Sequence, residues 1–260
     1  MSKTFYLNKK QAYLLAGATL LLAVLMSINL ALQSSMTQRL NLVEQTLWTV
    51  PKGAVLSGVC SELKRKDIVE DCFGLKLLAK FNPSLAAIKS GTYQLLPNMT
   101  LKQAITLFNE GKEHQFGFTL VEGENYFQVL DKLNRAPYLI DDISNLTLLQ
   151  AAEKLGLAHS SPEGFLKPDT YFYVANTRAS DLLLGAAERQ KALLNKHWQT
   201  AEKTKLLSTQ YDALILASII EKESAQQSER ADIASVFHNR LKKGMRLQTD
   251  PTVIYGVWQE

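Results

Sequence analysis

An uncharged, apolar segment close to the N-terminus constrains this chain more than any other feature. No charged side chain occurs from Gln11 to Gln38, and the stretch Ala12–Leu32 is predominantly apolar over 21 residues. A helix rises about 1.5 Å per residue, so a helix of this length matches a hydrocarbon core of roughly 30 Å. We therefore expect residues 11–32 to form a transmembrane helix.

Three lysines, Lys3, Lys9 and Lys10, precede this segment. By the positive-inside rule they predict a cytoplasmic tail over residues 1–10 and place the chain after residue 32 outside the cytoplasm. The alternative is a cleaved signal peptide, but the apolar run is long for one and no small-residue cleavage site follows it. Residues 33–45 are polar and are expected to form a juxtamembrane linker, with a continuation of the helix as the alternative.

The charge balance argues against a nucleic-acid partner. The 260 residues carry 29 Lys and Arg against 25 Asp and Glu, a net charge of +4, and three of the basic side chains precede the apolar segment. The rest of the chain is nearly neutral, unlike a protein that binds a phosphate backbone. No CxxC, HExxH or P-loop motif occurs, so we expect no metal and no cofactor.

A small module is expected to follow the linker. The β-branched run 46–50 ends at a Pro-Lys-Gly turn, helical spacing follows over 55–63 and 72–80, and a turn leads into a strand at 90–95. Strand, helix, helix, strand is the layout of a LysM-like module, which elsewhere binds glycan chains. We assign it to residues 46–113.

Cys60 and Cys72 lie 12 residues apart on the two predicted helices of this module. Outside the cytoplasm they could form a disulfide that joins the helix pair. The alternative, equally supported, is two buried thiols that behave as small hydrophobic side chains.

The second part of the chain begins with a helix and a strand. Thr100 and Gln103 have the spacing of a capping box, and Gly111 is placed to end that helix. Residues 116–121 alternate as a strand does, and from Tyr126 onward the pattern is mostly helical.

The residues expected to carry chemistry begin on an apolar helix. Thr209, followed three residues later by Asp212, is an N-cap signature, and the next turns are almost entirely apolar up to Glu221-Lys222-Glu223. A helix that is apolar on all sides is expected to be buried.

The two glutamates fall on different faces of this helix. Residues three, four and seven apart share a face, which places Glu223 beside Leu216, Ile219 and Ile220, and Glu221 on a smaller, partly polar face. Burial against isoleucines and the negative end of the helix dipole both disfavour ionisation of the Glu223 carboxyl, as a general acid requires. The alternative is an ordinary solvated helix end.

A further helix is expected from Ser228, with Gly244 as the C-cap residue, followed by the stretch MRLQTDPTVIYG over residues 245–256. This stretch concentrates hydrogen-bonding side chains in a tight turn before a proline. Such side chains suit the hydroxyl groups of sugars.

The run LASIIEKES, then ER and IASVFHNRLKKGMRLQTDPTVIYG, resembles the MltG/YceG-like endolytic murein transglycosylases. KSGTYQL (89–95), TLVEG (119–123) and EGFLKPDTY (163–171) resemble family stretches in the same order. The resemblance covers essentially the whole chain, including the anchor and the LysM-like module. It implies a protein of the bacterial inner membrane with its catalytic domain outside the cytoplasm.

The resemblance also implies a reaction. Lytic transglycosylases cut the bond between N-acetylmuramic acid and N-acetylglucosamine without water, leaving a 1,6-anhydro end. One glutamate acts first as general acid and then as base, so a second carboxylate at a defined separation is not required.

The residue that matches the family's catalytic acid is the second glutamate of Glu-Lys-Glu, Glu223, with Glu221 as the alternative. The remaining candidates fall into two groups: residues that position the substrate or Glu223, and residues that brace the site. Hydrogen bonds within turns and caps are an equally good explanation for both groups. The candidates for positioning are Glu221, Ser224, Gln248, Thr249 and Asp250, and the candidates for bracing are Asn239 and Arg240.

We therefore expect an α+β protein with a mainly helical catalytic domain over residues 114–260. Family members continue past TDPTVIYG with strands that close the catalytic cleft, whereas this sequence stops at Glu260. We accordingly expect a C-terminally truncated domain whose activity depends on whether those strands are needed.

Two other functions compete with the transglycosylase. A non-catalytic scaffold for cell-wall binding or division would use only the anchor and the LysM-like module. A lysozyme-type hydrolase is disfavoured because no second acid is evident. The expected partners are peptidoglycan strands and the membrane, and the family alone implies penicillin-binding proteins.

Overall fold

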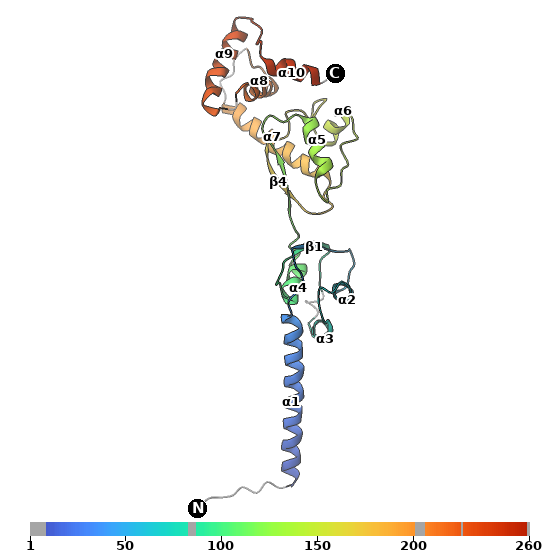
Figure 1. Ribbon diagram of the computed structural model, residues 1–260. Coiled ribbons are helices and arrows are strands. Elements are labelled where there is room, and N and C mark those ends of the chain that lie inside the picture. Colours follow the sequence, from blue (N-terminus) through green and yellow to red (C-terminus); the bar gives the residue numbers. More distant parts are fainter. Residues whose placement is uncertain (1–8, 83–86, 201–205, 225, 259–260) are drawn as a thin grey trace, which may run out of the picture. The chain divides into compact units, whose positions relative to one another are not determined.

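The computed structural model describes residues 9–82, 87–200, 206–224 and 226–258. The chain divides into two compact units, Met1–His114 and Gln115–Glu260 (Figure 1). Each unit combines helices with a two-stranded sheet, so the α+β class is confirmed.

The first unit begins with the long helix α1 (Lys9–Thr37). Its stretch Tyr13–Thr37 is long and apolar enough to cross a membrane, by length and composition. Unlike the predicted transmembrane segment, α1 continues five residues past Leu32 into the expected linker, because Leu32, Ser35 and Met36 pack against the rest of the unit.

The remainder of the first unit has the order strand, helix, helix, strand, helix. The strands pair antiparallel, with Trp48 opposite Tyr93. The capping box predicted at Thr100 is present, and Gly111 adopts the left-handed conformation at the C-cap, with φ of 72°. The elements are β1 (Thr46–Val50), α2 (Leu56–Arg65), α3 (Phe73–Phe81), β2 (Gly91–Leu95) and α4 (Leu101–Glu110).

The core of this unit lies between its sheet and its helices. Leu63, Leu75 and Tyr93 are fully buried, and the Tyr93 and Phe108 rings lie 4.9 Å apart. Cys60 and Cys72 form a disulfide, which decides between the two alternatives that the sequence left open. The disulfide joins α2 to the N-cap of α3.

The second unit carries one antiparallel strand pair and a succession of helices. Its elements are β3 (Phe116–Leu120), α5 (Tyr126–Arg135), α6 (Leu148–Lys154), β4 (Asp169–Tyr173), α7 (Ala179–Thr200), α8 (Gln210–Glu223), the 3₁₀ helix η2 (Gln227–Glu229), α9 (Arg230–Lys242) and α10 (Asp250–Trp258).

Strand β4 interrupts the region that the sequence predicted to be mostly helical. It pairs with β3, with Phe118 opposite Tyr171. Tyr171 and Tyr173 are buried whereas Phe172 between them is exposed, which is the two-residue alternation of a strand with one face on the core. Three aromatic residues in a row masked this alternation in the sequence.

Helix α8 corrects the prediction of burial on all sides. The capping box of Thr209 and Asp212 is present, but within the helix only Leu216 is buried, and Ile215 is 43% exposed. In the part of the chain that the structure describes, α8 packs against α7, α9 and α10. These helices cover only part of its circumference.

Candidate active site

A cavity of about 650 Å³ lies within the second unit. The loop 121–125, the start of α5 and the segment 162–168 form part of its wall, and α8 and α10 form most of the remainder, together with Leu120 of β3 and Gln190 of α7. Leu214, Ser218 and Glu221 reach the cavity from α8 because residues three and four apart share a helix face.

Glu221 lines this cavity and is fixed by an ion pair. The guanidinium of Arg230, the first residue of α9, donates to Oε1 of Glu221 at 2.7 Å. The two side chains are 28% and 35% exposed, so the pair is partly shielded from water. The Glu221 side chain is thus held in place between α8 and α9 by Arg230.

Lys222 also lines the cavity. Its side chain lies against the backbone of Gly123, where a Cβ would be 3.4 Å from Lys222 Cε. The loop 121–125 therefore meets the end of α8 at a glycine, whose φ of 76° is a conformation that favours this residue.

Glu223 is the last residue of α8, and its side chain is exposed. This corrects the expected burial against Ile219 and Ile220, which are themselves only half-buried. The hydroxyl of Thr249 donates a hydrogen bond to Oε2 of Glu223, and Thr249 is buried. Among the described residues, Glu223 stands beside the lining of the cavity rather than within it.

The loop 245–249 that carries Thr249 is braced from α9. Arg240 donates to the carbonyl oxygen of Leu247 at 2.7 Å and to Oε1 of Gln248 at 3.2 Å. Gln248 has φ of 51°, a left-handed conformation that is uncommon outside glycine. Arg240 thus links α9 to the loop 245–249, and the Gln248 side chain takes part in this contact.

The other predicted residues make local contacts or lie at the surface. Ser224 donates to Oε2 of Glu229 at 2.7 Å and accepts from the Gln226 backbone at 3.0 Å, which is a local turn. Asn239 is exposed on α9. Asp250 is exposed at the first position of α10, and the stretch that follows it is helical.

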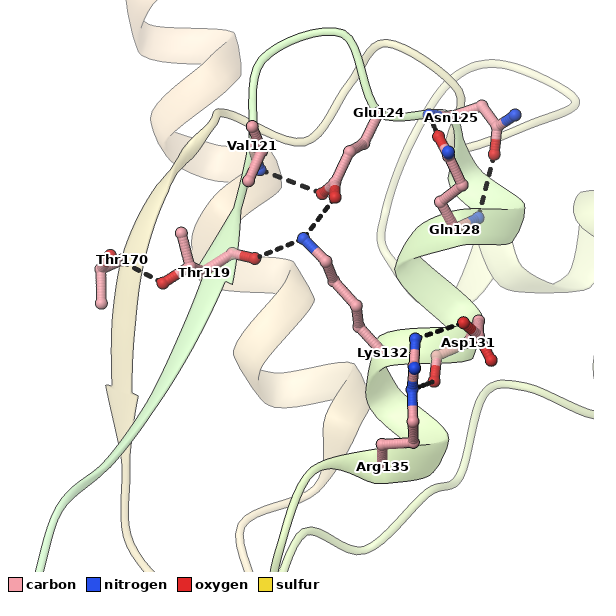
Figure 2. Close-up of polar contacts among 9 residues, drawn as sticks. All are labelled: Thr119, Val121, Glu124, Asn125, Gln128, Asp131, Lys132, Arg135 and Thr170. Atoms are coloured by element: carbon pink, nitrogen blue, oxygen red, sulfur yellow. Dashed lines mark hydrogen bonds and ion pairs between the residues drawn. The ribbon is translucent and has the colours of Figure 1, made fainter.

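The loop 121–125 at the cavity wall is held by α5 (Figure 2). Lys132 forms an ion pair with Glu124 and donates to the Thr119 carbonyl at 3.0 Å. Glu124 in turn accepts from the backbone N–H of Val121 at 3.0 Å. Because Lys132 and Glu124 are 29% and 19% exposed, water screens this pair only in part.

Glu163 is a cavity residue that the sequence analysis did not select. Burial raises the pKa of its carboxyl, and this effect exceeds the opposing ones of a 2.7 Å hydrogen bond from the Tyr126 backbone and of the Lys222 charge. Glu163 begins the stretch EGFLKPDTY that resembles the family, and this was the signal that could have identified it.

The arrangement supports proton transfer. Two glutamates, Glu163 and Glu221, line the cavity, and Glu223 stands beside it with one oxygen engaged by Thr249. No group of three or more side chains suited to a metal ion occurs among the described residues. The Glu223 carboxyl is exposed, and the buried Thr249 hydroxyl orients one of its two oxygens.

Comparison with known proteins defines the class. The profile described as the YceG-like family matches residues 48–260, so the chain belongs to the YceG-like family. The endolytic murein transglycosylase of Bacillus subtilis (strain 168) is 27% identical over 226 residues, which cover 80% of this chain and 62% of that protein. The endolytic murein transglycosylase of Streptococcus pneumoniae serotype 2 (strain D39 / NCTC 7466) is 23% identical, over 80% of this chain and 42% of that protein.

The chain therefore spans less than two thirds of the length of these two relatives. Among solved structures, the crystal structure of the yceG-like protein lmo1499 from Listeria monocytogenes is similar, with a TM-score of 0.44 and 26% identity. That match covers 82% of this chain and 76% of that one.

Proposed function

We propose that this protein is a membrane-anchored endolytic transglycosylase that cuts peptidoglycan strands, with Glu223 as its acid–base residue. The observation that carries the proposal is the family match over residues 48–260, which includes Glu223 and Thr249. Relatives named endolytic murein transglycosylase align with 80% of the chain, and this supports the same substrate class.

The proposed chemistry uses one carboxyl twice. Glu223 first gives its proton to the glycosidic oxygen while the bond from that oxygen to C1 of the muramic residue breaks. The resulting carboxylate then takes the proton of the C6 hydroxyl, whose oxygen forms the new bond to C1. Thr249 engages Oε2, so proton exchange with the strand falls to Oε1. The exposure of Glu223 leaves room for a strand to reach it.

The first unit is proposed to hold the protein at its substrate. Helix α1 is proposed to anchor the chain in the bacterial inner membrane with residues 1–10 in the cytoplasm, since Lys9 and Lys10 lie at its N-terminal end. The Cys60–Cys72 disulfide supports an extracytoplasmic location, where disulfides persist. The order β1-α2-α3-β2 supports a LysM-like module that binds glycan.

A non-catalytic wall-binding scaffold is the second candidate. The exposure of Glu223 and the partial cover of α8 are the observations that favour it, because an acid–base residue commonly works in a drier setting.

The deciding experiment analyses the ends of cut strands. The full chain is reconstituted in lipid vesicles and incubated with uncrosslinked glycan strands, and the new ends are identified by mass spectrometry. We expect 1,6-anhydro ends from the wild type and none from Glu223→Gln, which still binds strands. Glu221→Gln serves as the comparison variant and is expected to retain the same product.

Three results would contradict the proposal in different ways. Loss of anhydro ends in Glu221→Gln, with Glu223→Gln active, would move the acid to Glu221. Ordinary reducing ends would indicate a hydrolase. Strand binding without any cutting by the wild type would favour the scaffold.

A further inference from the structure

Helix α3 leaves an apolar face exposed on the side opposite to its core contacts. Gly74 and Leu75 are buried, whereas Phe73 and Phe81 at the two ends of the helix are 67% and 78% exposed. Two phenylalanines of this size are unusual on a surface that meets only water.

The exposed face also carries two lysines. Residues spaced by three, four, seven and eight share one side of a helix, so the outward face of α3 consists of the exposed Phe73, Lys76, Lys80 and Phe81 and the half-buried Leu77. Aromatic rings flanked by long cationic side chains characterise helices that lie in a membrane interface.

The exposure of side chains along α1 indicates where the membrane surface crosses this helix. Every described side chain from 13 to 31 is exposed, whereas Leu32 is half-buried and Ser35 and Met36 are buried in the first unit. Nineteen exposed residues make a helix of about 28 Å, which is the thickness of the hydrocarbon core. The boundary between hydrocarbon and headgroups therefore falls near Leu32.

Helix α3 is packed directly on this boundary, beside the C-terminal end of α1 (Figure 1). A Cβ on Gly74 would lie 2.5 Å from Cβ of Ser35 and 3.4 Å from Cα of Leu32, so only glycine permits the contact. Ser35 is three residues past Leu32, or about 4.5 Å further along the axis, and a headgroup layer is about 5–7 Å deep.

A second contact fixes the start of α3 to the end of α1. The amide of Gln38 donates to the Asp71 carbonyl at 2.6 Å, and its oxygen accepts from the Glu70 backbone N–H at 3.1 Å. Helix α3 begins at Phe73, directly after this contact. Its position along the axis of α1 is therefore fixed by the Gln38 hydrogen bonds and by the packing of Gly74 on Leu32 and Ser35.

We propose that the exposed face of α3 lies in the headgroup layer of the same bilayer that α1 crosses. Phe73, Leu77 and Phe81 insert at the acyl boundary, while Lys76 and Lys80 reach anionic headgroups. This inference rests on the proposed insertion of α1. Its consequence is that the first unit is held against the membrane by two contacts, and so cannot tilt freely about the end of α1.

The test measures the depth of nitroxide labels on the full chain in vesicles of phosphatidylethanolamine and phosphatidylglycerol. Labels are placed by Phe81→Cys on α3 and by Leu22→Cys in the middle of α1. Lys112→Cys is the matched control, because Lys112 is exposed and follows the C-terminal end of α4. The opposite end of α4 is the one near α1, since the backbone N–H of Leu101 donates to the Gln38 carbonyl. Mass analysis checks that the native disulfide is retained.

We expect the ratio of collisions with oxygen to collisions with a nickel chelate to be several-fold higher for the Phe81 label than for the Lys112 label. If the collision ratio of the Phe81 label equals that of the Lys112 label while the Leu22 label lies in lipid, the inference is wrong but the membrane insertion of α1 stands. The exposed face of α3 would then be expected to contact a protein. A water-accessible Leu22 label overturns the anchor itself, and with it the inference.

Discussion

The hydroxyl of Thr249 donates a hydrogen bond to the carboxylate of Glu223, across 26 residues of sequence. The contact ties the C-terminal end of α8 to the loop that precedes α10. Since Thr249 is buried and the loop is braced by Arg240, the orientation of the proposed acid–base residue depends on the segment 245–249 as much as on its own helix.

Replacing Thr249 by valine removes this hydrogen bond while keeping the shape of the side chain. We expect kcat for strand cutting to fall by roughly tenfold, the effect of losing one hydrogen bond of about 1.4 kcal/mol. The measurement is the rate at which anhydro ends appear. Thr249→Ser keeps the hydroxyl and should restore most of the rate and the wild-type pH profile. Equal rates in the valine and serine variants would contradict the prediction, because the loss of rate would then come from packing and not from the hydrogen bond.

The brace of the loop 121–125 gives a second prediction. Lys132→Met removes both the ion pair with Glu124 and the bond to the Thr119 carbonyl, and we expect a local loss of about 1–2 kcal/mol. Hydrogen exchange of the loop amides should accelerate accordingly, and strand cutting should slow because the cavity wall is released.

The matched control for Lys132 lies on the same helix. Arg135 pairs with Asp131 at a distance of four residues, and both side chains are about 70% exposed. Arg135→Met should therefore cost less than about 0.5 kcal/mol and leave exchange of the loop unchanged. An equal effect of the two substitutions would mean that general loss of charge on α5 is responsible.

The stability of the second unit should depend on pH through Asp142. Although burial raises its pKa, hydrogen bonds from Lys154 and Ser180 lower the pKa to about 2. A carboxyl whose pKa is lower in the folded state stabilises the fold above its unfolded pKa of about 3.9, and that contribution is lost as the pH falls toward 2.

Asp142→Asn is therefore expected to destabilise the second unit by about 2 kcal/mol at pH 6. The difference from the wild type should shrink between pH 4 and pH 2. Urea unfolding of the detergent-solubilised chain, followed by hydrogen exchange in the segments around Asp142 and Ser180, measures it. A difference that stays constant down to pH 2 would contradict the charge-based explanation.

The disulfide gives a prediction for the first unit. Its 12-residue separation closes a short loop, for which the loss of unfolded-state entropy corresponds to about 3 kcal/mol. The double variant Cys60→Ser and Cys72→Ser should unfold at lower urea concentration in this unit, whereas exchange in the second unit should not change. A wild type treated with reductant should behave like the double variant, and no shift in either sample would refute the prediction.

Local features of this fold could be predicted from the sequence because their partners lie within four residues. The capping boxes at Thr100 and Thr209 and the left-handed Gly111 depend only on neighbouring backbone groups, and all are present. The strands at 46–50 and 91–95 and the long apolar helix were predicted for the same reason: their patterns reflect a local period.

Features that depend on distant partners could not be predicted in the same way. Nothing local indicates that β4 pairs with β3, that Lys222 meets Gly123, or that Glu163 accepts a hydrogen bond from the Tyr126 backbone. The burial of α8 was predicted wrongly because hydrophobicity shows what a helix can bury, not which neighbours cover it.

Composition and short spacing were enough to identify the apolar N-terminal segment, the family motifs and the glutamates at the end of α8. The folded chain was needed to show that Cys60 and Cys72 are bonded, that Thr249 donates a hydrogen bond to Glu223, and that Arg230 pairs with Glu221. Each of these contacts joins residues on different elements, and their separation in space is fixed by packing rather than by any local pattern.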